Sequence, residues 1–208
     1  MILVFSDLHL GSLRSNIRLE DIENIVNKIQ PDTIIFNGDT IDCMVYEDFN
    51  DLKDELKKLG NCVFIRGNHD ENVGEHDNVY YTINNKRIKI FHGHSYGSGL
   101  RFLDKISTKI NEWILKYLKS DLQLFFRRIL SKQFKEGRYI QYLYNQRCEL
   151  IEEFEKLDYD VVISGHTHYP EHSKQQNFTY INVGNWKNYV TIDDESNITL
   201  HYIGSSND

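Results

Sequence analysis

The segment VVISGHTHYP, residues 161–170, joins a short apolar run to a glycine and to two histidines one residue apart. The run VVIS predicts a buried strand over 161–164. His166 and His168 then stand just beyond the carboxyl end of that strand. Two interpretations are open for them: polar residues that cap an exposed strand end, or metal ligands that the strand delivers to a site.

The same arrangement follows four earlier strand-like runs, at residues 2–6, 33–37, 62–66 and 87–91. The polar residues after these runs are, in order, Asp7 with His9, Asp39 with Asp42, Asn68 with His69 and Asp70, and His92 with His94. Ligands of open α/β sheets gather at the carboxyl edge of the strands. Six of the nine histidines stand at such positions. Coincidence does not explain five such clusters, so we interpret His166 and His168 as ligands.

The remaining pattern predicts the fold class. Apolar residues at helical spacing predict helices over 18–29 and 48–59, between the early strands. Residues 84–86 predict a hairpin turn between strands at 79–83 and 87–91. Further strands are expected over 178–183, 189–193 and 198–203. This order of elements predicts a layered α/β fold with a mixed sheet or two stacked sheets.

The chain of 208 residues is most simply a single domain, 1–208. From about 99 to 157 the pattern becomes long and helical, and we interpret this segment as an insertion between two strands. Residues 99–148 carry eleven Lys or Arg against four acidic residues, whereas the whole chain has a net charge of −7. Nucleic-acid binders usually show a basic footprint, so the overall charge argues against a general nucleic-acid partner.

The residue types at the strand ends indicate the chemistry. Imidazole, carboxylate and amide ligands without thiolate suit Mn, Fe, Co, Ni or Zn better than a structural cysteine-zinc site. There are more ligands than one ion uses, so two ions that share a carboxylate are expected. Two ions roughly 3.5–4 Å apart clamp the oxygens of a phosphoryl group and lower the pKa of a bridging water. We therefore expect a hydrolase.

The motifs DLH, GDTID, GNHD, HGH and GHTH, in this order over residues 7–168, resemble those of the calcineurin-like metallophosphoesterase superfamily. The resemblance implies a four-layer αββα sandwich: two stacked mixed sheets flanked by helices. One metal would be held by Asp7, His9, Asp39 and His168. The other would be held by Asp39, Asn68, His92 and His166, with Asp39 shared and a metal-bridging hydroxide as nucleophile.

The resemblance also implies roles for residues that do not bind metal. His69 would stabilise the charged transition state or protonate the leaving oxygen. Asp42 would orient the His69 imidazole, with Asp70 as the second candidate. Substrate contacts are expected from Arg66, His94, Arg127, Arg128, Asn185 and Trp186.

The helical insertion and the GNW motif at 184–186 resemble, more loosely, UDP-2,3-diacylglucosamine pyrophosphohydrolases, which place a helical cap over the metals. Such a cap over this site would suit an amphiphilic or nucleotide diphosphate, and Arg127 and Arg128 would suit its phosphates. The expected partner is a small-molecule phosphoester or diphosphate. Alternatives are a DNA-repair-type nuclease, a phosphomonoesterase and a non-catalytic metal-stabilised binding module.

Location is predicted from the cysteines and the apolar runs. Cys43, Cys62 and Cys148 are odd in number and lack metal-type spacing, as expected for free thiols in a reducing compartment. No apolar run approaches the roughly 18 residues of a membrane span. The N-terminal MILVF lacks the basic leader of a signal peptide. We therefore expect a cytoplasmic protein without a transmembrane segment.

Overall fold

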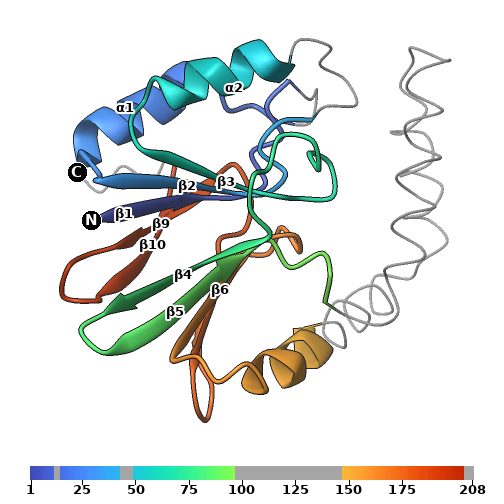
Figure 1. Ribbon diagram of the computed structural model, residues 1–208, viewed down its shortest axis with the longest axis vertical. Coiled ribbons are helices and arrows are strands. Elements are labelled where there is room, and N and C mark those ends of the chain that lie inside the picture. Colours follow the sequence, from blue (N-terminus) through green and yellow to red (C-terminus); the bar gives the residue numbers. More distant parts are fainter. Residues whose placement is uncertain (12–14, 43–48, 97–146, 204–208) are drawn as a thin grey trace, which may run out of the picture. The chain divides into compact units, whose positions relative to one another are not determined.

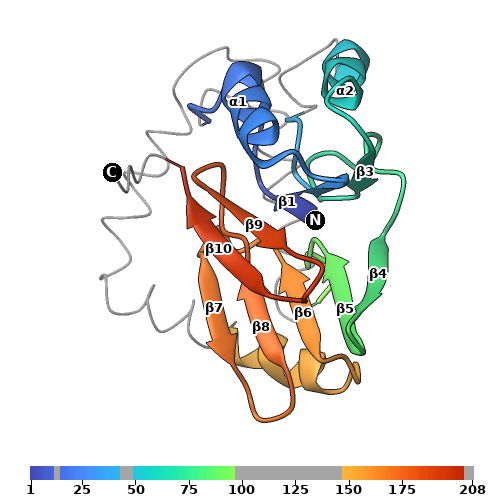
Figure 2. The same cartoon turned by 90° about the vertical axis from the view of Figure 1, so that its left-hand side faces the viewer.

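The computed structural model describes residues 1–11, 15–42, 49–96 and 147–203. The chain divides into two compact units, one of Met1–His94 with Tyr159–Asp208 and one of Ser95–Asp158. The described residues of the first unit form two sheets and two helices, whose arrangement can be followed in Figures 1 and 2. In the second unit, residues 147–155 are helical. The rest of the predicted helical cap, up to residue 146, lies outside the described residues.

The first sheet has the strand order β10-β9-β1-β2-β3. Its strands are β1 (Ile2–Phe5), β2 (Thr33–Asn37), β3 (Cys62–Ile65), β9 (Asn188–Ile192) and β10 (Ile198–Tyr202). Strands β1, β2 and β3 run parallel, whereas β9 is antiparallel to both β1 and β10. Helix α1 (Leu19–Ile29) connects β1 to β2, and helix α2 (Phe49–Lys57) connects β2 to β3. Crossover helices of this kind are what parallel strands require.

The second sheet has the strand order β4-β5-β6-β8-β7. Its strands are β4 (Asn78–Ile83), β5 (Lys86–Phe91), β6 (Val161–Ser164), β7 (Glu171–Lys174) and β8 (Thr179–Asn182). The central three are parallel, and the edge strands β4 and β7 are antiparallel to their neighbours. The sequence pattern did not predict β7. Its sequence, EHSK, has no apolar residue, and its pairing with β8 at the edge buries none of its residues.

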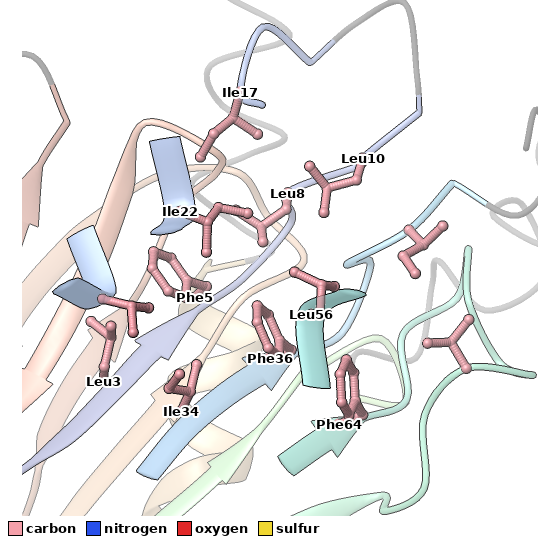
Figure 3. Close-up of a cluster of buried hydrophobic side chains, with 13 residues drawn as sticks. Leu3, Phe5, Leu8, Leu10, Ile17, Ile22, Ile34, Phe36, Leu56 and Phe64 are labelled. Carbon is pink, nitrogen blue, oxygen red and sulfur yellow. The ribbon is translucent and has the colours of Figure 1, made fainter. Parts of the chain in front are cut away.

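Two apolar clusters hold the layers of the first unit together. One lies between the sheets and joins residues such as Val4 and Ile35 to Ile90 and Ile163. The other lies between the first sheet and its helices, where Phe5, Phe36 and Phe64 stand on neighbouring strands under α1 and α2 (Figure 3). Burial of apolar surface on both faces explains why β1 and β2 are almost entirely buried.

These observations confirm the expected α/β sandwich of two stacked mixed sheets. Figure 1 shows α1 and α2 over the outer face of the first sheet, with the second sheet on its other side. Both predicted helices form, although each is slightly shorter than its pattern. None of the helices in the described part of the chain has the length and apolar character that a membrane span requires.

Candidate metal centre

The loops that follow the parallel strands meet at one edge of the sandwich, which we call the metal edge. The N–H of Asp7 donates to the carbonyl of Gly38 at 3.1 Å, which joins the ends of β1 and β2. The N–H of His166 donates to both carboxylate oxygens of Asp7, at 3.2 and 3.0 Å. The bonds between His166 and Asp7 join the two sheets, because Asp7 follows β1 in the first sheet and His166 follows β6 in the second.

A first group of donor atoms comes from Asp7, His9, Asp39 and His168, and these atoms all lie within 4.8 Å of one another. His168 Nε2 lies 3.1 Å from Asp7 Oδ1 and 3.3 Å from His9 Nε2. Ligands with bonds of about 2.0–2.2 Å to one ion stand roughly 3 Å apart. The spacing therefore suits a shared cation.

A second group of donor atoms lies beside the first and comes from Asp39, Asn68, His92 and His166. Asn68 Oδ1 lies 3.3 Å from His92 Nε2 and 3.0 Å from His166 Nδ1. Asp39 Oδ2 lies 3.5 Å from His92 Nε2 and 3.9 Å from His9 Nε2. The Asp39 carboxylate thus reaches both groups.

The carboxylates of this site are buried but ionised. Asp7 and Asp39 are 0% and 1% exposed. Burial is the largest influence on Asp39 and favours its neutral form, but charged histidines, foremost His92, outweigh it and hold its pKa well below the usual range. For Asp7, burial again opposes ionisation, and His92 and His168 outweigh it to lower the pKa.

The same two carboxylates favour the charged form of His92. Burial lowers the pKa of His92, but the carboxylates of Asp39 and Asp7 outweigh burial and raise it to about 10. Among the described residues, the ion-pair partners of both carboxylates are histidines. A divalent cation between the same donors would supply this positive charge, while the histidines would bind it in their neutral form. Donor set, spacing and charge all fit a divalent metal.

Several hydrogen bonds fix the orientation of these side chains. Ser6 Oγ donates to Asp7 Oδ2 at 2.6 Å, and the N–H of His69 donates to Asp39 Oδ1 at 2.8 Å. His92 Nδ1 bonds the carbonyl of Asn37 at 2.9 Å, which directs Nε2 toward the other donors. The sequence motifs do not predict these roles of Ser6 and Asn37. Asn37 acts through its backbone, so its residue type gives no signal.

The backbone is left-handed at five of the proposed ligands. The φ angles are 53° at Asp7, 47° at His9, 49° at Asp39, 67° at His166 and 59° at His168. For residues other than glycine this conformation costs roughly 1–2 kcal/mol each. Such strain persists where the surrounding structure enforces it, and it concentrates at functional sites.

Two glycines allow close approach of the loops at this edge. A Cβ atom at Gly165 would lie 1.9 Å from Ser6 Oγ and 2.4 Å from Asp7 Oδ2. One at Gly67 would lie 2.1 Å from Asp39 Oδ1. The glycines of the GHTH and GNHD motifs are therefore needed for space next to the two buried carboxylates.

His69 lies next to the first group and beside Asp42. His69 Nδ1 is 3.7 Å from Asp42 Oδ1, and the His69 ring is 5.0 Å from the ring of His9. His9, Asp42 and His69 also have donor atoms within 4.8 Å of one another. Of the two carboxylates considered as partners of His69, Asp42 thus lies close to its ring nitrogen, while Asp70 bonds backbone N–H groups.

The residues expected to contact substrate lie in different places. The His94 ring is 5.5 Å from that of His92, and burial, followed by the charges of His92 and His166, lowers its pKa to about 4. Arg66 instead forms an ion pair with Asp77 at 2.7 Å. Arg127 and Arg128 lie outside the described residues.

Asn185 and Trp186 make local contacts. Asn185 Oδ1 accepts a hydrogen bond from the N–H of Lys187 at 3.0 Å. Trp186 packs against the apolar cluster under α1 and α2, and the Lys187 ammonium lies 4.9 Å from the centre of its ring. Their predicted substrate contacts remain predictions.

Known proteins are similar to this chain in sequence and in structure. A UDP-2,3-diacylglucosamine hydrolase from Haemophilus influenzae (strain PittGG) is 24% identical over 216 residues, which cover 90% of this chain and 91% of the relative. Solved structures of Vps29 resemble the chain at a TM-score of 0.52. One is a double mutant from Entamoeba histolytica, 17% identical and covering 96% of both chains. The other, from Chaetomium thermophilum, is 14% identical and covers 97% of this chain and 96% of its own.

The similar solved structures support the sandwich fold, and a family model shows to which family the chain belongs. The model for calcineurin-like phosphoesterases matches residues 1–170, which include every strand-end motif at the metal edge. This match confirms the resemblance that the motifs indicated. The chain therefore belongs to the calcineurin-like phosphoesterase family, and it is a metal-dependent hydrolase.

Proposed function

We propose that this chain hydrolyses a phosphodiester or pyrophosphate bond with the help of two divalent metal ions, with manganese as the native metal. The first donor group, Asp7, His9, Asp39 and His168, would hold one ion. The second, Asp39, Asn68, His92 and His166, would hold the other. Fe, Co, Ni and Zn suit the same donors.

The observation that carries this proposal is the position of Asp39. Its Oδ2 atom lies 3.9 Å from a nitrogen of the first group and 3.5 Å from a nitrogen of the second. A single buried carboxylate oxygen between two donor groups is the arrangement expected of a shared ligand. When bound, the ions would supply Lewis-acid activation of water and neutralise charge on the phosphoryl oxygens.

The surrounding side chains would handle the proton and the substrate charge. His69 would protonate the leaving oxygen. Because its Nδ1 is turned toward Asp42, Nε2 is the nitrogen that would deliver this proton. His94, with its lowered pKa, is neutral near pH 7 and would act as a hydrogen-bonding contact to a phosphoryl oxygen.

For the substrate class we propose a nucleotide diphosphate that carries an amphiphilic group. The curated relative acts, by its name, on UDP-2,3-diacylglucosamine, and it matches this chain over 90% of its length. In the segment of about 99–157, where the sequence pattern predicts helices, apolar residues adjoin Arg127 and Arg128 in the sequence. Paired guanidiniums suit a diphosphate, and the apolar residues suit acyl chains.

We further propose that the protein works in the cytoplasm. Among the described residues, Cys62 and Cys148 are free thiols. Free thiols persist where the environment is reducing. Because the basic residues of 99–148 would suit the phosphates of a nucleic acid, single-stranded DNA is the competing substrate to be tested.

A substrate panel tests the proposal. Metal-stripped protein would be assayed with added Mn on UDP-2,3-diacylglucosamine, bis-p-nitrophenyl phosphate, p-nitrophenyl phosphate and single-stranded DNA. We expect release of UMP from the first, since water attack on the diphosphate separates two monophosphates. Slower hydrolysis of the aryl diester is expected.

Other outcomes of the panel would contradict the proposal in distinct ways. A preference for DNA would indicate a nuclease, and activity limited to p-nitrophenyl phosphate would indicate a phosphomonoesterase. Metal binding without hydrolysis of any substrate would indicate a binding module.

A further inference from the structure

The side chain of Asp70 joins the two loops that carry the shared carboxylate and the amide ligand. Its Oδ1 accepts hydrogen bonds from the N–H of Asp39 at 3.1 Å and from the N–H of Gly67 at 2.8 Å. Its Oδ2 accepts from the N–H of Thr40 at 2.6 Å and from that of Ile41 at 3.4 Å. One buried side chain therefore receives N–H groups from the loop after β2 and from the loop after β3.

Only an ionised carboxylate matches these partners. A carboxylate accepts about four hydrogen bonds and donates none, whereas a carboxamide has one oxygen and an NH₂ group that only donates. With a carboxamide at this position, NH₂ would face backbone N–H groups on one side. Buried N–H groups without an acceptor cost roughly 1–3 kcal/mol each.

The bracing between the two loops is reciprocal. The carboxylate of Asp70, on the loop after β3, holds the backbone of Asp39. The carboxylate of Asp39, on the loop after β2, accepts the N–H of His69 at 2.8 Å. The two loops pack so closely that a Cβ at Gly67 would lie 2.2 Å from the N of Asp39 and 2.8 Å from Asp70 Oδ1.

We propose that Asp70 is a positioning residue that sets the separation of Asp39 from Asn68 and thereby the affinity of the site for its metals. It binds no metal itself, since its contacts are to backbone N–H groups. The inference rests on the proposed function of the metal edge. It assigns to Asp70 a role different from that of the orienting partner of His69.

The test compares two Asp→Asn variants of the full chain. Asp70→Asn replaces the carboxylate that joins the two loops at the metal edge with a carboxamide. Asp193→Asn is the matched control, because Asp193 Oδ1 also accepts backbone N–H groups, from Glu195 at 2.9 Å and Asn197 at 2.8 Å, in the turn between β9 and β10. Manganese binding to metal-stripped protein would be measured by titration calorimetry, at a temperature where circular dichroism shows each variant folded.

For Asp70→Asn we expect Kd for Mn to rise about 10- to 100-fold, the range typical of residues that orient metal ligands. At saturating Mn, kcat for bis-p-nitrophenyl phosphate should fall while KM stays constant. Asp193→Asn should leave Kd and kcat unchanged. If Asp70→Asn does not fold, Asp70→Glu serves instead, since it retains the carboxylate but displaces it by one methylene, and the same rise in Kd is expected.

An unchanged Kd for Mn in a folded Asp70 variant would overturn the inference, even if the melting temperature fell, because Asp70 would then be purely structural. Failure of the proposed function is distinguishable from this result. It would appear as absence of Mn binding or of hydrolysis in the wild-type protein itself. Absence of wild-type Mn binding would overturn both.

Discussion

The sandwich has two ends that use the same backbone conformation for different purposes. At the metal edge, left-handed φ angles occur at the proposed ligands, such as Asp7 and His168. At the opposite end, which we call the turn edge, they occur at Asn84 and Asn85 between β4 and β5 and at Ser196 between β9 and β10. Asparagine tolerates this conformation because its side chain bonds locally, whereas histidine gains nothing comparable from a turn.

Both ends also join the two sheets, but with different groups. At the turn edge, Asn84 Nδ2 donates to the carbonyl of Asp194 at 3.0 Å, and Lys86 Nζ donates to that of Ser196 at 3.4 Å. The first of these bonds is exposed. At the metal edge the N–H of His166 donates to the buried carboxylate of Asp7, and His92 Nδ1 bonds the carbonyl of Asn37. The left-handed residues reverse the chain direction at the turn edge, whereas at the metal edge they direct the proposed ligand side chains toward one another.

The comparison predicts that removal of a charge has a large effect at the metal edge and almost none at the turn edge. Asp39→Asn should lower turnover of bis-p-nitrophenyl phosphate more than about a hundredfold, beyond the usual range for residues that only orient ligands. It should also lower the metal content, because the one carboxylate shared by both donor groups is weakened. Activity assays and metal analysis of the purified variant would measure both effects.

The control is Asp32→Asn at the turn edge, where Asp32 pairs with the exposed N-terminal ammonium. Exposed ion pairs contribute little, so activity and metal content should match wild type. Equal loss in both variants would show that the buried carboxylate has no special role.

Within the metal edge, His69→Asn should separate proton transfer from metal binding. We expect kcat to fall about a hundredfold, at the lower end of the range for general acid–base residues. Both metals should remain bound, because His69 belongs to neither proposed ligand group. Metal analysis beside steady-state kinetics would test this, and loss of an ion would make His69 a ligand.

Metal should stabilise the protein through the metal edge. At a hundredfold excess over Kd, binding to the native state alone adds about 2.7 kcal/mol to the free energy of unfolding. Thermal melts of metal-stripped protein, with and without Mn, would show the shift. The Mn-induced shift of the melting temperature should be smaller in Asp39→Asn than in wild type, and it should be the same as wild type in Asp32→Asn. A melting temperature that Mn and Zn leave unchanged would count against the whole site.

A smaller effect is expected from a methyl group at the tight contact between the sheets. Gly165→Ala should lower the free energy of unfolding by about 1–3 kcal/mol, as overpacking usually does. The loops would have to shift, because the added Cβ would overlap Ser6 Oγ and Asp7 Oδ2 in the present structure. Urea unfolding of the metal-stripped variant would measure the change. Asn85→Gly at the turn edge should change it by less than about 0.5 kcal/mol, as surface substitutions do.

The sequence predicted the parts of the fold that depend on local patterns. Apolar runs and helical spacing located α1, α2 and the strands with apolar residues. The polar clusters after those strands indicated that Asp7, Asp39 and His92 would gather, and the structure brings them together. Strand β7 escaped prediction because an exposed edge strand needs no apolar residue.

Contacts made through backbone atoms could not be predicted in the same way. The hydrogen bonds that Asp70 accepts from the loop after β2 come from N–H groups, which every residue type except proline possesses. The left-handed conformation of His9 and His168 follows from the packing of loops that are far apart in the sequence. The sequence also could not predict that the Arg66 guanidinium pairs with Asp77, and the phosphate contact expected of Arg66 stays a prediction.

The separation of the site residues along the chain has a consequence for the order of folding. His9 and His168 are 159 residues apart, as are Asp7 and His166. Closing such long loops is entropically costly, and the two sheets must dock before either pair can meet. We therefore expect the metal edge to form late, after the transition state for folding. Ions that bind it should prolong the lifetime of the native protein by slowing unfolding, while the rate of folding stays nearly the same.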